Sequence, residues 1–267
     1  MIGVFDSGVG GLSVLRAICQ QMPSESVIYF GDQDHVPYGP RSLEEVQAFS
    51  DGITRFLLSQ GAQLIVVACN AASAAALHYL RIQFPAIPFV GMEPAVKPAA
   101  ENTRSGVVGV LATPATFQGR LYASVVERFA KGVQVLQDTC PGLVGEIELG
   151  HLDGPKTRTI LENALRPMLA QGIDTVVMGC THYPFVIPLI SQIAGPGVRV
   201  IDPAPAVARQ TGRLLEQHGW LEESGTPGTV RYLTSGDPEK MNALLEQLLG
   251  VKAQAAKATW SNGQLTA

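Results

Sequence analysis

Two cysteines far apart in the sequence have similar surroundings, and both could take part in acid/base chemistry. Cys69 follows the apolar run 64–68, and Cys180 follows the apolar run 176–178. Each is followed by polar residues and then by a segment with helical character, although Pro184 and Pro188 make the helix start after Cys180 ambiguous. A thiol placed there is expected at the positive end of a helix, which favours the thiolate. One such cysteine is more often buried and inert, but two in equivalent positions favour a chemical role.

A glycine-rich segment could lie beside the first cysteine. The residues Asp6-Ser7-Gly8-Val9-Gly10-Gly11 directly follow an apolar run. Glycines let the backbone approach a ligand, and the helix start after them can bind an anion. Ser13 replaces a glycine of the dinucleotide fingerprint and no P-loop lysine is present, so both kinds of nucleotide site are disfavoured. A tight turn capped by Asp6 is the simpler alternative.

His182 lies two residues after Cys180 and could orient or protonate a group in the same pocket. Zinc bound by these two residues and Cys69 is an alternative, but no Cys-x-x-Cys spacing supports it, so we predict no metal. The turn Pro37-Tyr38-Gly39 could offer a hydroxyl and free backbone N–H groups to a carboxylate, or be an ordinary turn. The other histidines, His35 among them, are expected at the surface or in satisfied core positions.

Two opposed thiols suit the removal of a proton from one side of a carbon and its return on the other side, which is racemisation or epimerisation. One cysteine must be a thiolate and the other a thiol, and the reverse states run the reaction backwards. Backbone N–H groups and Ser, Thr and Asn side chains would hold a substrate carboxylate and spread the carbanion charge. No pyridoxal-lysine setting is recognisable, so we expect no cofactor.

The elements that must position these residues follow an α/β pattern. Apolar, β-branched runs alternate with amphipathic segments, which predicts parallel sheets with helices on both faces. The predicted strands are 2–5, 27–30, 64–68, 107–111, 176–178 and 198–201, and the clearest helices are 43–60, 117–130 and 157–171.

An internal echo predicts two similar domains. Three short segments recur 106 to 111 residues further along the chain: 3–7 at 109–113, 66–70 at 177–181 and 93–95 at 202–204. We therefore expect two three-layer α/β sandwiches with the active site in the cleft between them. The first, discontinuous domain would comprise 1–93 plus 204–267 and the second 94–203, with acidic-Pro segments at the crossings. Residues 251–267 lack periodicity and are expected to fray.

Composition narrows the classes of function. The chain has 267 residues, 46% hydrophobic and 16% charged, enough for a full core and unlike a disordered chain. The net charge of −4 without a basic cluster argues against a nucleic-acid or anionic-membrane partner. No signal-peptide pattern and no apolar run of the ~20 residues of a membrane helix is present. Four scattered cysteines fit a reducing, cytoplasmic setting.

At these residues the sequence resembles the glutamate racemases of the aspartate/glutamate racemase family. The likeness runs in order from residue 2 to about 205, and the segments that carry it are Ile2 to Val14, Pro37-Tyr38-Gly39, Ala68-Cys69-Asn70 and Gly179-Cys180-Thr181-His182-Tyr183-Pro184. The resemblance implies cofactor-independent interconversion of L- and D-glutamate, which supplies D-glutamate for bacterial peptidoglycan. A homodimer is common in families of this type.

The resemblance also implies roles for individual residues. It makes Cys69 and Cys180 the catalytic bases, assisted by Asp6 and His182 respectively. Substrate contacts would come from Asp6, Ser7, Tyr38, Gly39, Asn70, Ala71, Thr181 and His182. Asp32 and Glu148 match acidic residues that the family has near the site.

One departure keeps alternatives open. The family usually has a threonine where Ala71 stands, and the lost hydroxyl is worth ~1.5–3 kcal/mol if it bonds a substrate carboxylate. Another acidic substrate such as aspartate, or a non-catalytic two-lobed binder of an acidic metabolite, would fit this change. A cysteine hydrolase with Cys180 as nucleophile and His182 as base is a further alternative, which gives Cys69 no role.

Overall fold

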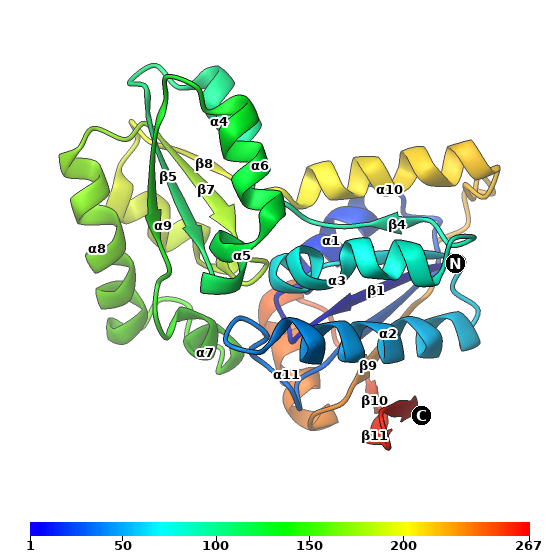
Figure 1. Cartoon of the computed structure of the whole chain (residues 1–267). Coiled ribbons are helices and arrows are strands. Elements are labelled where there is room, and N and C mark those ends of the chain that lie inside the picture. The colour runs from blue at the N-terminus through cyan, green and yellow to red at the C-terminus, as the bar shows by residue number, and fades with distance from the viewer. The chain divides into compact units, whose positions relative to one another are not determined.

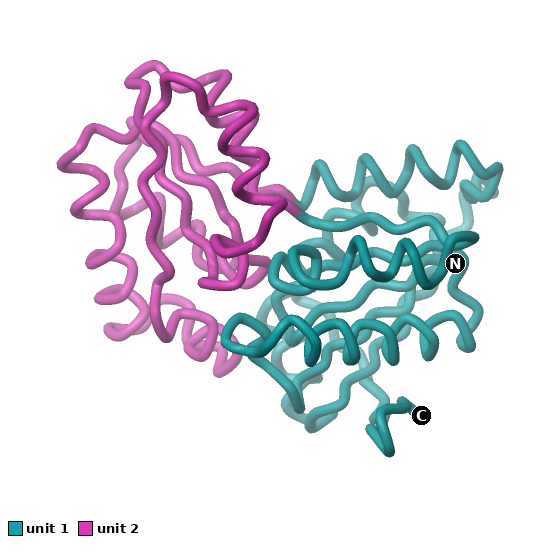
Figure 2. Tube along the Cα trace, in the orientation of Figure 1, with its two compact units in different colours: residues 1–92, 204–267 teal, residues 93–203 magenta.

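The computed structural model describes residues 1–267. The chain forms two parallel β-sheets and a separate C-terminal hairpin. The chain divides into two units, coloured separately in Figure 2. Unit 1 comprises Met1–Met92 and Ala204–Ala267, and unit 2 comprises Glu93–Pro203. Every strand pair in the two sheets is parallel.

Unit 1 contains a six-stranded sheet in the order β10-β9-β2-β1-β3-β4. Its strands are β1 (Ile2–Asp6), β2 (Val27–Gly31), β3 (Leu64–Val67), β4 (Phe89–Val90), β9 (Val230–Thr234) and β10 (Ala255–Lys257). Its helices are α1 (Leu12–Gln21), α2 (Leu43–Ser59), α3 (Asn70–Gln83), α10 (Ala204–His218) and α11 (Pro238–Leu249). Helix α1 packs with α10 and α11, and α2 packs with α3, so two helix layers enclose the sheet (Figure 1). The three central strands are buried throughout, as parallel strands covered on both faces must be.

Unit 2 contains a four-stranded sheet in the order β6-β5-β7-β8. Its strands are β5 (Val107–Ala112), β6 (Gln134–Asp138), β7 (Thr175–Gly179) and β8 (Arg199–Ile201). Its helices are α4 (Val96–Asn102), α5 (Pro114–Gln118), α6 (Arg120–Phe129), α7 (Leu143–Glu148), α8 (Pro155–Ala170), the 3₁₀ helix η1 (Tyr183–Val186) and α9 (Ile187–Ala194). Helix α4 packs with α6, and α8 packs with α7 and α9 (Figure 1).

The two sheets share one topology. In unit 1 the order β2-β1-β3-β4 places the first strand between the second and third, and in unit 2 β6-β5-β7-β8 repeats this arrangement. Strand β5 therefore corresponds to β1, and β7 corresponds to β3, which is the pairing that the internal echo predicts. The prediction of two similar α/β domains with parallel sheets is confirmed.

The sequence predictions for two segments were wrong. The single helix expected over 117–130 is two helices, because Gly119 between α5 and α6 has extended backbone angles of −68° and 135°. The C-terminal segment does not fray. Strand β10 extends the sheet beside β9, and β11 (Thr259–Ser261) and β12 (Gln264–Thr266) form an antiparallel hairpin. The helical-periodicity criterion misses such three-residue strands.

Candidate active site

Cys69 lies just beyond the carboxyl end of β3 and is the N-cap residue of α3. Its sulfur accepts a hydrogen bond from the backbone N–H of Ala72 at 3.4 Å and lies 3.8 Å from the hydroxyl oxygen of Ser7. The side chain is almost completely buried. An N–H donor at the positive end of a helix favours negative charge on the sulfur, as the sequence pattern predicts for this cysteine.

Asp6 ends β1, the central strand next to β3, and is fully buried. Its carboxylate accepts hydrogen bonds from the backbone N–H groups of Gly8 at 3.4 Å and Gly11 at 2.8 Å. A Cβ at Gly11 would lie 2.7 Å from the Cβ of Asp6, so only glycine fits there. The capped turn that the simpler alternative predicts is therefore present, and it holds Ser7 near the sulfur of Cys69.

Asn70, the first residue of α3, carries the least satisfied polar side chain of this edge. Its amide nitrogen and oxygen are both buried, and neither has a hydrogen-bond partner. An unsatisfied buried polar group costs about 1–3 kcal/mol, so a ligand is a natural explanation for two of them on one side chain. An amino acid offers both a carboxylate to accept and an ammonium group to donate. The neighbouring Ala71 is also buried, and its methyl group can do neither.

Tyr38 and Gly39 follow the carboxyl end of β2. The hydroxyl of Tyr38 donates to Oδ2 of Asp32 at 2.6 Å. Burial, followed by the charge of Asp32, raises the pKa of Tyr38 well above its usual value, so the phenol keeps its proton. Because that proton is directed at Asp32, the groups left for a carboxylate are the backbone N–H groups of Tyr38 and Gly39, which no other group of the chain accepts.

Cys180 directly follows β7, the strand of unit 2 that corresponds to β3. Its sulfur lies 3.8 Å from Nδ1 of His182, and Nε2 of His182 lies 2.6 Å from Oε1 of Glu148, the last residue of α7. Thr181, between the cysteine and the histidine, is buried as well. Unit 2 therefore builds a continuous chain from a thiol through an imidazole to a carboxylate.

No regular helix begins directly after Cys180, where Pro184 and Pro188 make the helix start ambiguous from the sequence. A 3₁₀ helix occupies Tyr183–Val186, and α9 begins only at Ile187. Pro184 and Pro188 lack the N–H groups that a regular helix would need there. The charge partner of Cys180 is therefore the side chain of His182 and not a helix N-terminus.

His182 is completely enclosed, and its protonation state follows from its two partners. Burial alone would lower the pKa of His182, but the hydrogen bonds to Cys180 and Glu148 raise it well above its usual value. The raised pKa favours the protonated ring, which can donate to Cys180 and to Glu148. It can hold or deliver a proton at the sulfur of Cys180.

A metal site and a membrane span have no structural basis here. No group of three or more His, Cys, Asp or Glu side chains is arranged to hold a metal ion. None of the helices combines the length and the apolar character that crossing a bilayer requires. All four cysteines are free thiols, namely Cys19, Cys69, Cys140 and Cys180.

Comparison with known proteins gives the family. The sequence model of the Asp/Glu/Hydantoin racemase family matches residues 2–211. The chain belongs to this family. It is 52% identical over 253 residues to a glutamate racemase of Ectopseudomonas mendocina, covering 95% of this chain and 96% of the relative. It is 51% identical over 256 residues to a glutamate racemase of Pseudomonas aeruginosa strain PAO1, covering 96% of each.

Solved structures of family members have the same fold. A glutamate racemase from Bacillus anthracis superposes with a TM-score of 0.87 at 34% identity, covering 99% of this chain and 98% of that one. The Escherichia coli glutamate racemase, solved with L-glutamate and an activator, gives 0.84 at 31% identity, covering 100% and 98%. The Francisella tularensis enzyme, solved with D-glutamate, gives 0.82 at 30% identity, covering 97% of each. The predicted family and the predicted enzyme class, an amino-acid racemase, are confirmed.

Sequence reasoning missed part of the polar network of this racemase family member. His35, expected without company, donates from Nδ1 to the Asp32 carboxylate at 2.9 Å and stacks on Phe49. Ser235 and Trp260 also donate to Asp32, from positions more than two hundred residues away. The Asn262-Gly263 pair is a typical two-residue hairpin signal and could have located the segment that carries Trp260.

Proposed function

We propose that this protein interconverts L- and D-glutamate by a cofactor-independent two-base mechanism with Cys69 and Cys180. The observation that carries the proposal is the equivalence of their positions: each thiol follows the third strand of a sheet with the order second-first-third-fourth. A duplicated topology that presents the same reactive group twice suits a reaction with two mirror-related proton transfers.

In this mechanism one cysteine, as a thiolate, removes the α-proton of glutamate and becomes a thiol. The other cysteine, as a thiol, gives its proton to the opposite face of the carbanion and becomes a thiolate. No atom is lost or gained, and the reverse protonation states run the reaction from the other enantiomer. His182, paired with Glu148, supplies the charge that Cys180 needs to change its state. Backbone N–H groups and Asp6 supply the corresponding polar environment of Cys69.

The substrate contacts in this proposal are the polar groups at the two strand edges. The unpartnered amide of Asn70 and the free N–H groups of Tyr38 and Gly39 support a ligand with carboxylates. We assign the remaining contacts to Asp6, Ser7, Ala71, Thr181 and His182. Ala71 would contribute only its backbone N–H, because its side chain has no hydroxyl.

Glutamate is the proposed substrate because several relatives are glutamate racemases and two of their structures contain L- or D-glutamate. A bacterial enzyme of this kind would supply D-glutamate for peptidoglycan synthesis in the cytoplasm. Because Ala71 has no hydroxyl to bond a substrate carboxylate, aspartate is tested beside glutamate. The side chain of aspartate is shorter, so its carboxylate would lie at a different distance from position 71.

The test is incubation of the purified protein with L-glutamate in D₂O, with optical rotation and α-deuterium followed together and L-aspartate run in parallel. We expect rotation to decay to zero with glutamate and deuterium to appear at the α-carbon. The variants Cys69→Ser and Cys180→Ser should each lose racemisation, whereas Cys19→Ser, a partly exposed thiol of α1, is the matched control and should retain it. Full activity in either of the first two variants would refute the two-base mechanism. Binding without turnover in the wild type would favour the non-catalytic binder.

A further inference from the structure

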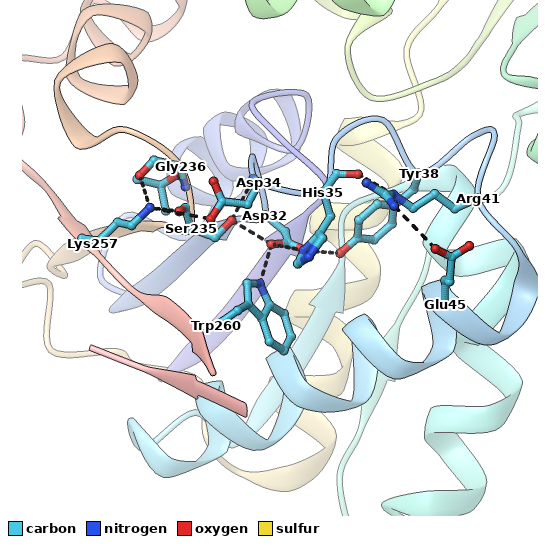
Figure 3. A network of polar contacts seen from close by, with 11 residues as sticks. Asp32, Asp34, His35, Tyr38, Arg41, Glu45, Ser235, Gly236, Lys257 and Trp260 are labelled. Atoms are coloured by element: carbon cyan, nitrogen blue, oxygen red, sulfur yellow. Dashed lines mark hydrogen bonds and ion pairs between the residues drawn. The ribbon is translucent and has the colours of Figure 1, made fainter. Parts of the chain in front are cut away.

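The carboxylate of Asp32 collects donors from three separate segments of unit 1 (Figure 3). It is fully buried. His35 and Tyr38 donate from its own loop, Ser235 donates to Oδ1 at 2.7 Å from the end of β9, and Trp260 donates to Oδ1 at 2.8 Å from β11. The two oxygens therefore have different partners: Oδ1 accepts from the distant residues Ser235 and Trp260, and Oδ2 accepts from Tyr38.

The indole of Trp260 is fixed by its surroundings as well as by this bond. A Cβ at Gly52 in α2 would lie 2.8 Å from the ring, so helix and ring are in close contact. The ring also lies edge-on to His35, with centroids 5.5 Å apart, and 6.0 Å from the centroid of Phe49. This packing holds the ring in the position from which its N–H donates to Asp32.

The segment just before Trp260 is anchored to the same loop as Ser235. The ammonium group of Lys257 donates to the backbone oxygens of Ser235 and Gly236, and it lies 3.7 Å from the carboxylate of Asp34. The C-terminal segment therefore contacts the Asp32 network twice, through Lys257 at Ser235 and through Trp260 at Asp32 itself (Figure 3).

We propose that Trp260 is a positioning residue for substrate binding: its indole N–H orients Asp32, and Asp32 orients the Tyr38 loop. This inference rests on the proposed function, in which the backbone N–H groups of Tyr38 and Gly39 bind a substrate carboxylate. Without the Trp260 donor, Oδ1 keeps Ser235 and the longer contact to His35, and Oδ2 keeps His35 and Tyr38, so the carboxylate stays in place but is held less tightly on the side of Oδ1. A loop displaced by a fraction of an ångström binds its ligand less well.

The kinetic signature follows from where Tyr38 acts. Its loop contacts a carboxylate and not the reacting carbon, so the contact is equally strong in the ground state and in the transition state. Loss of such uniform binding raises KM and leaves kcat unchanged. A residue that only stabilises the fold would lower the fraction of active enzyme, and therefore apparent kcat, at unchanged KM.

The test compares Trp260→Phe, which keeps an aromatic ring and removes the N–H, with Trp220→Phe. Trp220 is the other tryptophan of the chain and stacks on His218, so its replacement is the matched control. For W260F we expect KM for both enantiomers to rise about tenfold, the lower end for a lost bond to a charged group, with kcat within about twofold of wild type. W220F should match the wild type in both constants.

Two further variants make the outcome decisive. In Y38F the hydroxyl is already gone, so W260F/Y38F should have the KM of Y38F within about twofold, since the two changes break one chain of contacts. If W260F is too unstable to assay, benzothienylalanine at position 260 in the W220F background keeps the shape of indole without its N–H and should give the same rise in KM.

The dissociation constant of glutamate, measured by calorimetry on the same proteins, separates this inference from the proposed function. A wild type that racemises glutamate, with W260F unchanged in KM and dissociation constant, would overturn the role of Trp260 alone. A wild type that binds glutamate without racemising it would refute the proposed function, and a tenfold weaker dissociation constant in W260F would still support the positioning role. A wild type that neither binds nor racemises glutamate would overturn both.

Discussion

The two cysteine sites occupy the same place in two copies of one sheet, yet they are built from different chemistry. At Cys69 the sulfur is an N-cap and receives a backbone N–H from α3. At Cys180 the sulfur contacts His182, which is paired with Glu148. The acidic residue at the end of β1 is Asp6, while its counterpart at the end of β5 is Ala112.

This difference shows that topology and electrostatics are specified separately. The sheet order places a thiol at each carboxyl edge, but the local residues decide what surrounds it. Pro184 and Pro188 interrupt a regular helix start after Cys180, and the side chain of His182, whose pKa is raised, lies beside the sulfur instead. The two thiols are thus expected to be matched in position and unequal in their response to mutation and pH.

The largest expected effect is loss of racemisation in the cysteine variants, with exchange of the α-hydrogen against solvent retained. Each of C69S and C180S should lose racemisation by about 10²–10⁴-fold, the usual contribution of one general acid or base. Each retains the other thiol, so each should still exchange the α-hydrogen of one enantiomer with D₂O. The preferred enantiomers should be opposite in the two variants. Exchange of the same enantiomer in both, measured by ¹H NMR, would contradict the assignment of one thiol to each face.

The next largest effect is expected from the partner that only unit 2 has. His182→Asn removes the imidazolium and should lower kcat by about 10²-fold, because a positioned proton-transfer group is lost. We expect kcat to fall more in the direction that uses Cys180 as the base than in the reverse direction. Because the equilibrium constant stays at one, the KM values of the two enantiomers must change in compensation. Initial rates from pure L- and pure D-glutamate measure this. His151→Asn, at an exposed histidine of the same unit that contacts Glu146, is the control and should leave both rates intact.

A smaller effect concerns a hydroxyl that directly follows only one of the two cysteines. Thr181 follows Cys180, whereas neither Asn70, its counterpart after Cys69, nor Ala71 carries a hydroxyl. Ala71→Thr adds a donor and should lower KM for glutamate by about tenfold, the lower end for one charge-assisted bond. Ala74→Thr makes the same change at a partly exposed position of α3 and should leave KM unchanged. An unchanged or higher KM in A71T would mean that the site is filled in another way.

The smallest effect concerns stability against pH. His182 has a raised pKa in the folded chain, so its pairing with Glu148 stabilises the fold fully below the usual histidine pKa of about 6.5. That contribution is lost as pH rises through the raised value. The melting temperature of the wild type relative to Glu148→Gln should therefore be highest near pH 6 and decline toward alkaline pH. A difference independent of pH would show that the pair is neutral.

Sequence reasoning recovered what short-range patterns encode. The strand that ends at Asp6 and the strands that precede Cys69 and Cys180 were predicted to within a residue or two, because buried parallel strands are continuous apolar runs. The spacing of Cys180 and His182 predicted that the two side chains share one site, and in the structure the sulfur lies 3.8 Å from Nδ1 of the ring.

The missing parts depend on contacts between distant residues. The bond from Trp260 to Asp32 joins positions 228 residues apart, and no local pattern indicates which aromatic ring reaches a given carboxylate. The partner of His182 is similarly hidden, because Glu148 reaches it from the end of a six-residue helix. Both contacts can be identified only once the three-dimensional fold is known.

Unit 1 is completed last during synthesis. Unit 2 is continuous in sequence, whereas the partner of β2 at its outer edge is β9, which is translated only after all of unit 2. Until Val230–Thr234 has left the ribosome, the nascent chain carries β2 as an open edge of apolar residues. Translation that stops before this point would leave a strand able to pair with another chain, so the closing strands protect the protein against aggregation.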